Sequence, residues 1–289
     1  MKRFFKIFVN LTAVLMLAAV CLSFAACEEV KSVELNLQIA NYTSSKLHDE
    51  KDVKLTIGIN KTLAPETSEK ILSYISEGYY DSCVFYMDEG FSKQIMVGDL
   101  KFDANGNLVQ NAIKPALEGE FEKGGVTGSN LKNQNGSVGL WRSWGKDGKN
   151  VNNGFDSGRA TWFLPSETIT EYDGYFCVFA TIDLNAGTNQ FALGAIASAL
   201  SGDNYESYVI YFTGEYDETK LDENYGLTFH ALKKADFDKL TDDEKDEIFV
   251  ANKDGENKNE LLEFNQKTVR IAKDVEGVNG AMIKSAKAV

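Results

Sequence analysis

The amino-acid sequence predicts a mostly β protein with two helices. Residues 53–59 (VKLTIGI) alternate apolar and polar side chains, which is the period of a half-buried strand. Residues 65–78 (PETSEKILSYISEG) begin with proline, which is favoured at the first helical position, and end on Gly78, which can take the left-handed conformation that stops a helix. Residues 189–202 (NQFALGAIASALSG) repeat apolar side chains at helical spacing.

Each helix has an apolar stripe that predicts which side faces the core. In the first helix the stripe consists of Ile71, Leu72 and Ile75. In the second, Asn189 is the expected N-cap, and the apolar face carries Leu193, Ile196 and Leu200.

Residues 83–180 contain only strand and loop signals. Residues 103–108 (DANGNL) predict a tight turn, which we prefer to a calcium loop because the later acidic ligand is missing. Residues 175–182 (YFCVFATI) predict a buried strand. We interpret Cys83 and Cys177 as buried thiols, with a disulfide between them as the alternative.

The last third of the sequence changes in composition. Residues 202–262 are acidic; within them YVIYFTG predicts a strand, and Thr241 with Glu244 forms a capping box that predicts a helix. We expect this segment to be dispensable for the fold. Residues 267–275 (KTVRIAKDV) predict the closing strand.

Composition excludes several classes of function. The formal net charge of -13 makes nucleic acid an improbable partner, since an acidic surface repels phosphates. The two histidines, His48 and His230, are too few for a His-rich metal site and disfavour a Ser-His-Asp triad. We therefore expect no metal and no cofactor.

The N-terminus resembles a bacterial lipoprotein signal. Lys2, Arg3 and Lys6 precede an apolar run that ends in LSFAAC, so that Cys27 is the expected site of lipidation, although Phe24 departs from the usual leucine. The alternative is an uncleaved membrane anchor, because the run is nearly long enough to span a bilayer. Both interpretations place the rest of the protein outside the cytoplasmic membrane.

Several blocks in order resemble the cyclophilin-type peptidyl-prolyl isomerases over about residues 52–200. The blocks are APETSEKILSYISEGYYDSCVF (64–85), VGD (97–99), KPALEGEF (114–121), NLKNQNGSVGLWRS (130–143), SGRATWFLP (157–165) and YDGYFCVFATI (172–182). The resemblance implies a closed eight-stranded antiparallel β-barrel capped by two helices, with the acidic segment as an α/β insertion before the last strand. The expected parts are a lipoprotein signal peptide (1–26), a polar tether (27–51) in which SVELNLQI could form one short strand, the barrel (52–201), the insertion (202–262), and the closing strand with a C-terminal tail (263–289).

The resemblance also implies a surface groove that binds an extended peptide. In the family an apolar pocket holds the proline ring, and an arginine beside the proline nitrogen favours the twisted amide. Met87 stands at the arginine position and Tyr86 at a histidine position. The segment from Phe85 to Asp99 is one residue longer than in the family, so either Gln94 or Met96 corresponds to the peptide-binding glutamine.

The remaining groove positions are matched block by block. Phe163 retains the phenylalanine of the proline pocket, Thr161 replaces a second glutamine, and Arg142 is a possible substitute for the missing arginine, as are Arg159 and Lys93. For Phe163, Tyr172 and Phe176 the alternative is ordinary core packing. The complete expected groove consists of Phe91, Gln94, Met96, Trp141, Arg142, Thr161, Phe163, Tyr172 and Phe176.

These matches predict an extracytoplasmic, lipid-anchored isomerase that assists the folding of secreted or surface proteins. Methionine cannot donate a hydrogen bond, so Met87 predicts weakened activity. The alternatives are an inactive cyclophilin-fold module that binds peptides or proteins, and a surface scaffold whose insertion binds a partner. We expect proline-containing peptides or unfolded secreted chains as partners, a membrane contact through the lipid, no nucleic acid, and a monomer.

Overall fold

The structure is a computed structural model of the 289-residue protein. It describes residues 29–41, 46–47, 53–126, 131–143, 154–214, 226–248, 266–275 and 278–289. The predicted signal peptide and Cys27 lie outside these residues. Within the described part, no helix has the length and apolarity needed to cross a membrane.

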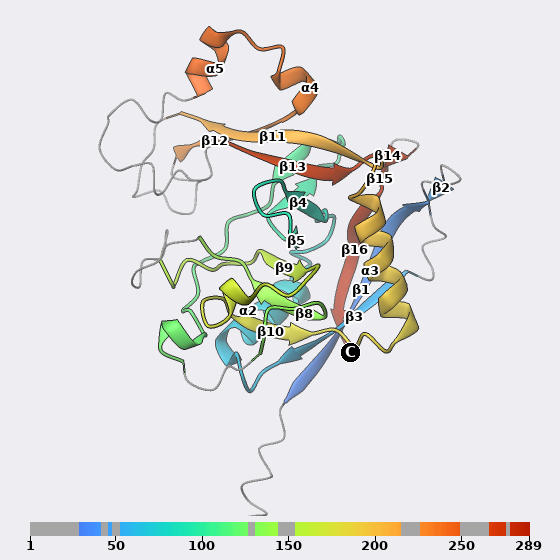
Figure 1. The fold of residues 1–289 in the computed structure, drawn as a ribbon, viewed down its shortest axis with the longest axis vertical. Coiled ribbons are helices and arrows are strands. Elements are labelled where there is room, and N and C mark those ends of the chain that lie inside the picture. The colour runs from blue at the N-terminus through green and yellow to red at the C-terminus, as the bar shows by residue number, and fades with distance from the viewer. Residues whose placement is uncertain are drawn as a thin grey trace, which may run out of the picture.

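Antiparallel strands dominate the molecule, as predicted (Figure 1). The main sheet has twelve strands, and β2 (Lys46–Leu47) pairs with β1 beside its path. Along the path the order is β12 (Thr228–Lys233), β11 (Tyr205–Thr213), β13 (Gln266–Ala272), β4 (Tyr86–Asp88), β5 (Gln94–Val97), β9 (Trp162–Pro165), β8 (Ser137–Leu140), β10 (Val178–Thr181), β3 (Lys54–Asn60), β1 (Val30–Asn41) and β16 (Ala281–Ala288). Two hairpins are separate, β6 (Leu100–Phe102) with β7 (Leu108–Gln110) and β14 (Asp274–Val275) with β15 (Val278–Asn279).

Two longer helices pack on the sheet. The helix α2 (Pro65–Ser76) contacts β16, β10 and β3, and α3 (Gly187–Ala199) contacts β3 and β1. Short helices follow elsewhere in the described chain: α4 (Lys234–Phe237), α5 (Asp242–Ile248) and the 3-10 turns Glu122–Gly124 and Thr170–Tyr172. The predicted stripes face the core, since Ile71, Ile75 and Ile196 are almost fully buried.

The start of α2 is stabilised from a distant loop. Its N-cap residue, Ala64, has no side-chain acceptor, but the buried carboxylate of Glu120 accepts hydrogen bonds from the backbone N–H groups of Glu66 and Thr67 at 3.0 and 2.7 Å. A carboxylate at this end satisfies free N–H groups and opposes the helix dipole. The helix ends before Gly78, whose φ of 71° is left-handed, as predicted.

The N-cap prediction for α3 is wrong. The N-cap is Ala186, and Asn189 lies inside the first turn, 2% exposed. The Asn189 side chain instead accepts a hydrogen bond from the Thr56 backbone N–H at 2.9 Å and donates to the Asp183 carbonyl at 3.0 Å. It therefore ties α3 to β3.

The short strand considered for SVELNLQI exists and is longer than expected, but its place in a polar tether is wrong. The strand β1 pairs with β3 on one side and β16 on the other, and its alternate residues Val33, Leu35, Leu37 and Ile39 are at most 1% exposed. These side chains belong to the main core, so the folded body begins near residue 30 rather than 52.

The C-terminal region differs from prediction as well. The strand β13 pairs with β11 and β4, whereas the segment expected to be a tail forms β16 beside β1. Backbone hydrogen bonds also join β16 to the residues just before β4: Phe85 N–H donates to Ala281 O at 3.1 Å and Ile283 N–H to Cys83 O at 2.9 Å. The closed eight-stranded barrel remains a prediction.

The acidic segment extends the sheet instead of standing apart from it. The strands β11 and β12 continue from β13, and α4 and α5 cover their outer side at the top of Figure 1. The predicted capping box is confirmed, since Thr241 and Glu244 exchange hydrogen bonds between side chain and backbone. On one side Val209 and Tyr211 pack with Phe237, and on the other Ile210 joins a cluster of the main body.

Two smaller predictions are confirmed. Residues 103–107 form the turn of the β6–β7 hairpin, where Asp103 accepts hydrogen bonds from the Asn105 and Asn107 backbones. Cys83 and Cys177 are free and buried, and burial raises the pKa of each thiol to about 12.

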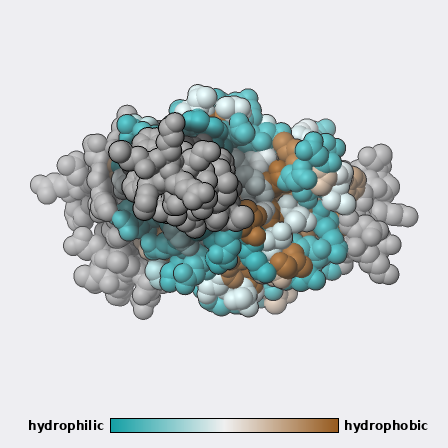
Figure 2. Space-filling view, turned by 90° about the horizontal axis from the view of Figure 1, so that it is seen from below, coloured by the Kyte–Doolittle hydropathy of each residue, from teal (hydrophilic) through white to brown (hydrophobic). Residues whose placement is uncertain are grey.

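On the face shown in Figure 2, hydrophilic residues predominate and the hydrophobic residues form small separate patches.

Candidate functional site

The sheet around β5 and β9 has two differently packed faces. Ile95 and Trp162 point into the main core, whereas the alternate residues Met96 and Phe163 belong to a second cluster. Met96 lies directly opposite Phe163 in the register of β5 and β9. We call the side that carries these two residues the Phe163 face. Phe163 packs onto Gly139, where an added Cβ would stand 2.3 Å from the ring.

Four of the predicted groove residues form one aromatic cluster on this face: Trp141, Phe163, Tyr172 and Phe176. Trp141 stacks on Phe176 with ring centroids 5.4 Å apart and stands edge-on to Phe163 at 6.1 Å. Tyr172 stacks on Phe176 at 4.4 Å. The structure therefore brings these four predicted residues together from the end of β8, from β9 and from the loop before β10.

The aromatic cluster is filled by its own side chains. Phe163 is fully buried, and Trp141 and Tyr172 are only 8% and 7% exposed. Phe91, which is 36% exposed, lies on the outer side with its ring 5.1 Å from that of Trp141. Thr161 is half-buried beside this site, and its carbonyl accepts a hydrogen bond from the backbone N–H of Trp141 at 2.8 Å. Trp141, Tyr172 and Phe176 thus pack directly over Phe163.

Gln94 and Met96 lie on the same face, two residues apart. Met96 is directly opposite both Tyr86 and Phe163, so it occupies the central position between them. Gln94 is fully buried, and within the described part of the chain its amide oxygen and nitrogen have no hydrogen-bond partner. Burial raises the pKa of Tyr172 to about 12, and the nearby Gln94 side chain opposes this rise. The geometry between the two side chains is not that of a hydrogen bond.

The structure does not bring Met87 together with Phe163. In β4, Tyr86 points to the Phe163 face and Met87 packs against the main core on the other face. Across the ladder Met87 lies opposite Arg270. The residue of β4 that lies on the Phe163 face beside Met96 is therefore Tyr86 and not Met87.

The cations expected to substitute for the arginine are engaged elsewhere. Arg142 is 3% exposed, donates to the carbonyls of Tyr175 and Ser143 at 2.7 Å, and lies 4.8 Å from the Phe176 ring on the outside of the aromatic cluster. Burial lowers the pKa of Arg142 to about 10, so the guanidinium stays charged at neutral pH. Arg159 donates to the Lys114 carbonyl, and Lys93 forms ion pairs with Glu167 and Glu171.

A polar cluster that the sequence analysis missed lies on the Phe163 face next to Met96. The Tyr86 hydroxyl donates to Asp99 Oδ2 at 2.9 Å. Lys267 Nζ lies 3.5 Å from both the Tyr86 hydroxyl and Asp99 Oδ2, and 5.1 Å from the Tyr86 ring centroid. Burial raises the pKa of Tyr86, so its hydroxyl remains a donor. One signal was available in the sequence, because the alternation in KTVRI places Lys267 on the same side as Val269 and Ile271.

A second carboxyl group lies close to this polar cluster. Asp88 is 7% exposed and accepts a hydrogen bond from the Gly90 N–H at 2.8 Å. Burial raises the pKa of Asp88, and the charge of Lys267 opposes that rise. Lys267 is therefore paired with Asp99, and its charge also acts on the carboxyl group of Asp88.

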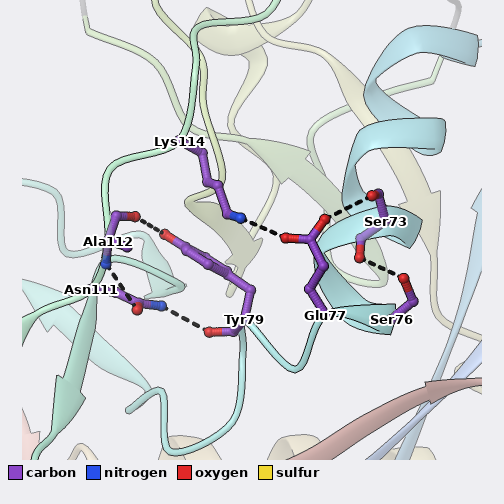
Figure 3. A network of polar contacts seen from close by, with 7 residues as sticks. All are labelled: Ser73, Ser76, Glu77, Tyr79, Asn111, Ala112 and Lys114. Carbon is purple, nitrogen blue, oxygen red and sulfur yellow. Dashed lines mark hydrogen bonds and ion pairs between the residues drawn. The ribbon is translucent and has the colours of Figure 1, made fainter. Parts of the chain in front are cut away.

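A polar network fixes the chain that leads from α2 into β4 (Figure 3). Glu77 at the end of α2 accepts from Lys114 at 2.7 Å, and the Tyr79 hydroxyl donates to the Ala112 carbonyl at 2.8 Å. Asn111 donates to the Tyr79 carbonyl at 2.9 Å. These bonds hold residues 77–79 against residues 111–114, and so position β4.

Comparison with protein families matches residues 45–207 to the model of the cyclophilin-type peptidyl-prolyl cis-trans isomerases. No curated protein matches the chain. Among solved structures, the chain is similar to a Cryptosporidium parvum cyclophilin-type isomerase crystallised in the presence of the dipeptide Ala-Pro, with 14% identity, a TM-score of 0.37, and coverage of 60% of this chain and 88% of that one. A second structure of that isomerase gives 14% identity, a TM-score of 0.39, and coverage of 61% and 88%.

Proposed function

Because the chain belongs to the cyclophilin-type peptidyl-prolyl cis-trans isomerase family, we propose that it is an extracytoplasmic, lipid-anchored isomerase of weakened activity. It assists the folding of secreted or surface proteins by binding proline-containing segments. The observation that carries this proposal is the meeting of Met96, Trp141, Phe163, Tyr172 and Phe176 in one cluster on one face of the sheet.

We also propose that the strands close into the eight-stranded barrel of the family. Support comes from the end strand β16, which is hydrogen-bonded to residues 83–85 immediately before β4. These bonds link the first and last members of the series β4, β5, β9, β8, β10, β3, β1 and β16. Closure leaves no free edge between them, and it places the Phe163 face on the outside.

The mechanism requires no covalent step. The uncatalysed rotation of a peptide bond has a barrier of about 18–20 kcal/mol, which amide resonance sets. Catalysis lowers it by holding the proline in an apolar pocket and by stabilising the twisted amide with a donor or positive charge. Here the aromatic cluster provides the pocket once Trp141 moves. Neither Met87 nor Arg142 presents a donor to Phe163, which supports weakened turnover.

The proposed activity is tested by the exchange rate of the two prolyl isomers of an Ala-Ala-Pro-Phe peptide, measured by NMR. A protease-coupled assay on the same peptide gives a second rate. We expect a rate enhancement that is at least about tenfold below that of a relative with the arginine, since loss of one preorganised donor commonly costs 10²–10³. Absence of both binding and exchange would refute the proposal.

A second candidate function is a peptide-binding module without catalysis. It is favoured by one observation, the filling of the pocket by Trp141, which is 8% exposed. The two functions differ in the same NMR experiment. Shifts of the peptide resonances without faster exchange would identify the binding module.

Membrane attachment rests on the leader and on Cys27. We expect the wild-type protein to incorporate radiolabelled palmitate and to fractionate with membranes. A Cys27→Ala variant should lose the label, because the thiol is the acceptor of the lipid. Equal labelling of both proteins would show that the attachment uses another residue.

A further inference from the structure

The family position that holds an arginine has no cation of its own in this protein, yet a cation lies on the same face of the sheet. Lys267 Nζ stands 5.1 Å from the ring centroid of Tyr86. Tyr86 is directly opposite Met96, and Met96 is directly opposite Phe163. Lys267 is therefore placed beside the row of residues that runs across β4, β5 and β9 to the proline pocket.

The position of Lys267 follows from the register of β13. Val269 pairs with Asp88 and Ile271 with Tyr86, and both Val269 and Ile271 are buried in the cluster of the Phe163 face. Lys267 is two residues before Val269, so strand alternation puts its side chain on that face as well. Arg270, the other cation of this strand, is out of phase and pairs with Glu89.

The strand that carries Lys267 belongs to the part of the protein that is not shared with the family model. The match ends at residue 207, and β13 begins at Gln266. The strand is held by seven residue pairs with β11, which itself continues the sheet toward β12. The acidic segment thus has a structural consequence for the groove: it aligns β13 beside β4.

The surroundings of Lys267 favour a role in binding. Its side chain is 13% exposed, so its charge is poorly screened by water and acts on a nearby dipole more strongly than a surface charge. Asp99 Oδ2 and the Tyr86 hydroxyl fix its position at 3.5 Å. The second oxygen of this carboxylate, Asp99 Oδ1, is buried and has no hydrogen-bond partner among the described residues, so Asp99 Oδ2 carries the polar contacts that hold Lys267.

We propose that Lys267 is the positively charged contact that the groove offers to a bound proline-containing peptide. The Lys267 ammonium group interacts with a backbone carbonyl oxygen next to the proline. Asp99 and Tyr86 hold this ammonium group in place. The inference rests on the proposed function, since it names a contact within the proposed groove.

The test compares three variants with the wild type on the Ala-Ala-Pro-Phe peptide, with binding and exchange measured by NMR. Lys267→Met removes the charge and keeps the chain length, and we expect kcat/KM to fall about tenfold or more, mostly through kcat. Lys267→Arg retains the charge and should keep most of the rate. Lys239→Met removes a lysine of the acidic segment whose ion pair with Asp236 is on the surface, and it should have no effect.

A purely structural role of Lys267 would give a different pattern. It would lower the melting temperature of Lys267→Met without a change in the rate per folded molecule. If Lys267→Met does not fold, Lys267→Gln, which retains a donor without charge, is measured in its place with the same expected loss.

The outcomes separate this inference from the proposed function. A wild type that binds or turns over the peptide, together with an equally effective Lys267→Met, would overturn the role of Lys267 alone. A wild type that neither binds nor turns over the peptide would overturn both. If the wild type binds without turnover, the dissociation constant is the readout, and a value about tenfold weaker in Lys267→Met supports the inference.

Discussion

Trp141 decides access to the proposed pocket because its indole contacts most of the other aromatic side chains there. Its ring centroid lies 5.4 Å from Phe176, 6.1 Å from Phe163 and 6.4 Å from Tyr172. Aromatic pairs of this kind contribute about 0.5–1.5 kcal/mol each beyond the burial of their area. The free energy that keeps the indole in place therefore competes directly with the binding of a proline ring.

Replacement of Trp141 should open the pocket. We expect Trp141→Ala to lower the free energy of unfolding by about 3–5 kcal/mol and to bind the Ala-Ala-Pro-Phe peptide about tenfold more tightly. Chemical denaturation and NMR titration measure the two effects. Phe155→Ala is the control, because it removes a half-buried ring outside the aromatic cluster. Weaker peptide binding by Trp141→Ala would show that the indole is part of the binding surface.

Met87 provides a second test at the scale of single residues. Since its side chain packs against the main core, an arginine there would not reach Phe163. We expect Met87→Arg to leave the isomerisation rate per folded molecule unchanged and to lower stability, because a charge would replace an apolar contact. The NMR exchange assay and thermal unfolding measure both. A rise in rate of tenfold or more would place residue 87 in the groove.

At the scale of secondary-structure elements, a buried polar side chain ties each of the two main helices to a distant part of the chain. The N-terminus of α2 uses Glu120, and α3 is tied to β3 through Asn189. In both cases a buried polar group satisfies backbone N–H groups that would otherwise lose water without a replacement. These contacts link each helix to a distant part of the chain, so the helices are expected to unfold together with the sheet.

The capping of α2 can be measured directly. We expect Glu120→Gln to lower the free energy of unfolding by about 1–3 kcal/mol, since the buried N–H groups of Glu66 and Thr67 lose a charged acceptor. Denaturant titration followed by circular dichroism gives the value. Glu69→Gln, an exposed change within α2, should cost less than about 0.5 kcal/mol. Equal costs for the two variants would contradict the capping role.

At the scale of the whole molecule, the acidic segment shares a core with the rest. Ile210 of β11 and Val269 and Ile271 of β13 are buried in the same cluster as Tyr86 and Phe163. Removal of residues 202–262 would therefore leave β13 without its partner β11 and expose part of the Phe163 face. The expectation that this segment can be deleted at those boundaries needs revision.

The structure suggests better boundaries for a deletion. The Lys273 N–H donates to the Asn204 carbonyl at 2.8 Å, so the two ends of residues 205–272 already lie side by side and a short link costs little loop entropy. We expect a chain that joins Asn204 to Lys273 through two glycines to unfold cooperatively at a lower temperature than the wild type. We expect the 202–262 deletion to be less stable than this variant. Calorimetry measures both, and gradual melting of the glycine-linked chain would show that the inserted strands are required for the fold.

The sequence by itself determined the features that depend on local patterns. Alternation in residues 53–59, the proline and glycine that bound α2, and the capping box at Thr241 all predicted elements that the structure confirms. The ordered blocks around Phe163 and Tyr172 predicted residues that do lie together. Local propensity and a block that resembles a family are both properties of a short stretch of sequence. They can therefore be recognised without knowledge of what the stretch packs against.

Only the tertiary structure decided what pairs across long separations. The burial of Leu35 in β1 depends on pairing with β3 and with β16, and β16 lies near the opposite end of the amino-acid sequence. The side to which Met87 points depends on how β4 pairs with β5 and β13, because a shift of one residue in register would turn every side chain of the strand to the other face. Lys267 reaches the Phe163 face because β11 and β4 align β13 between them. Such pairings are set by the packing of the whole sheet, and no short stretch of sequence contains them.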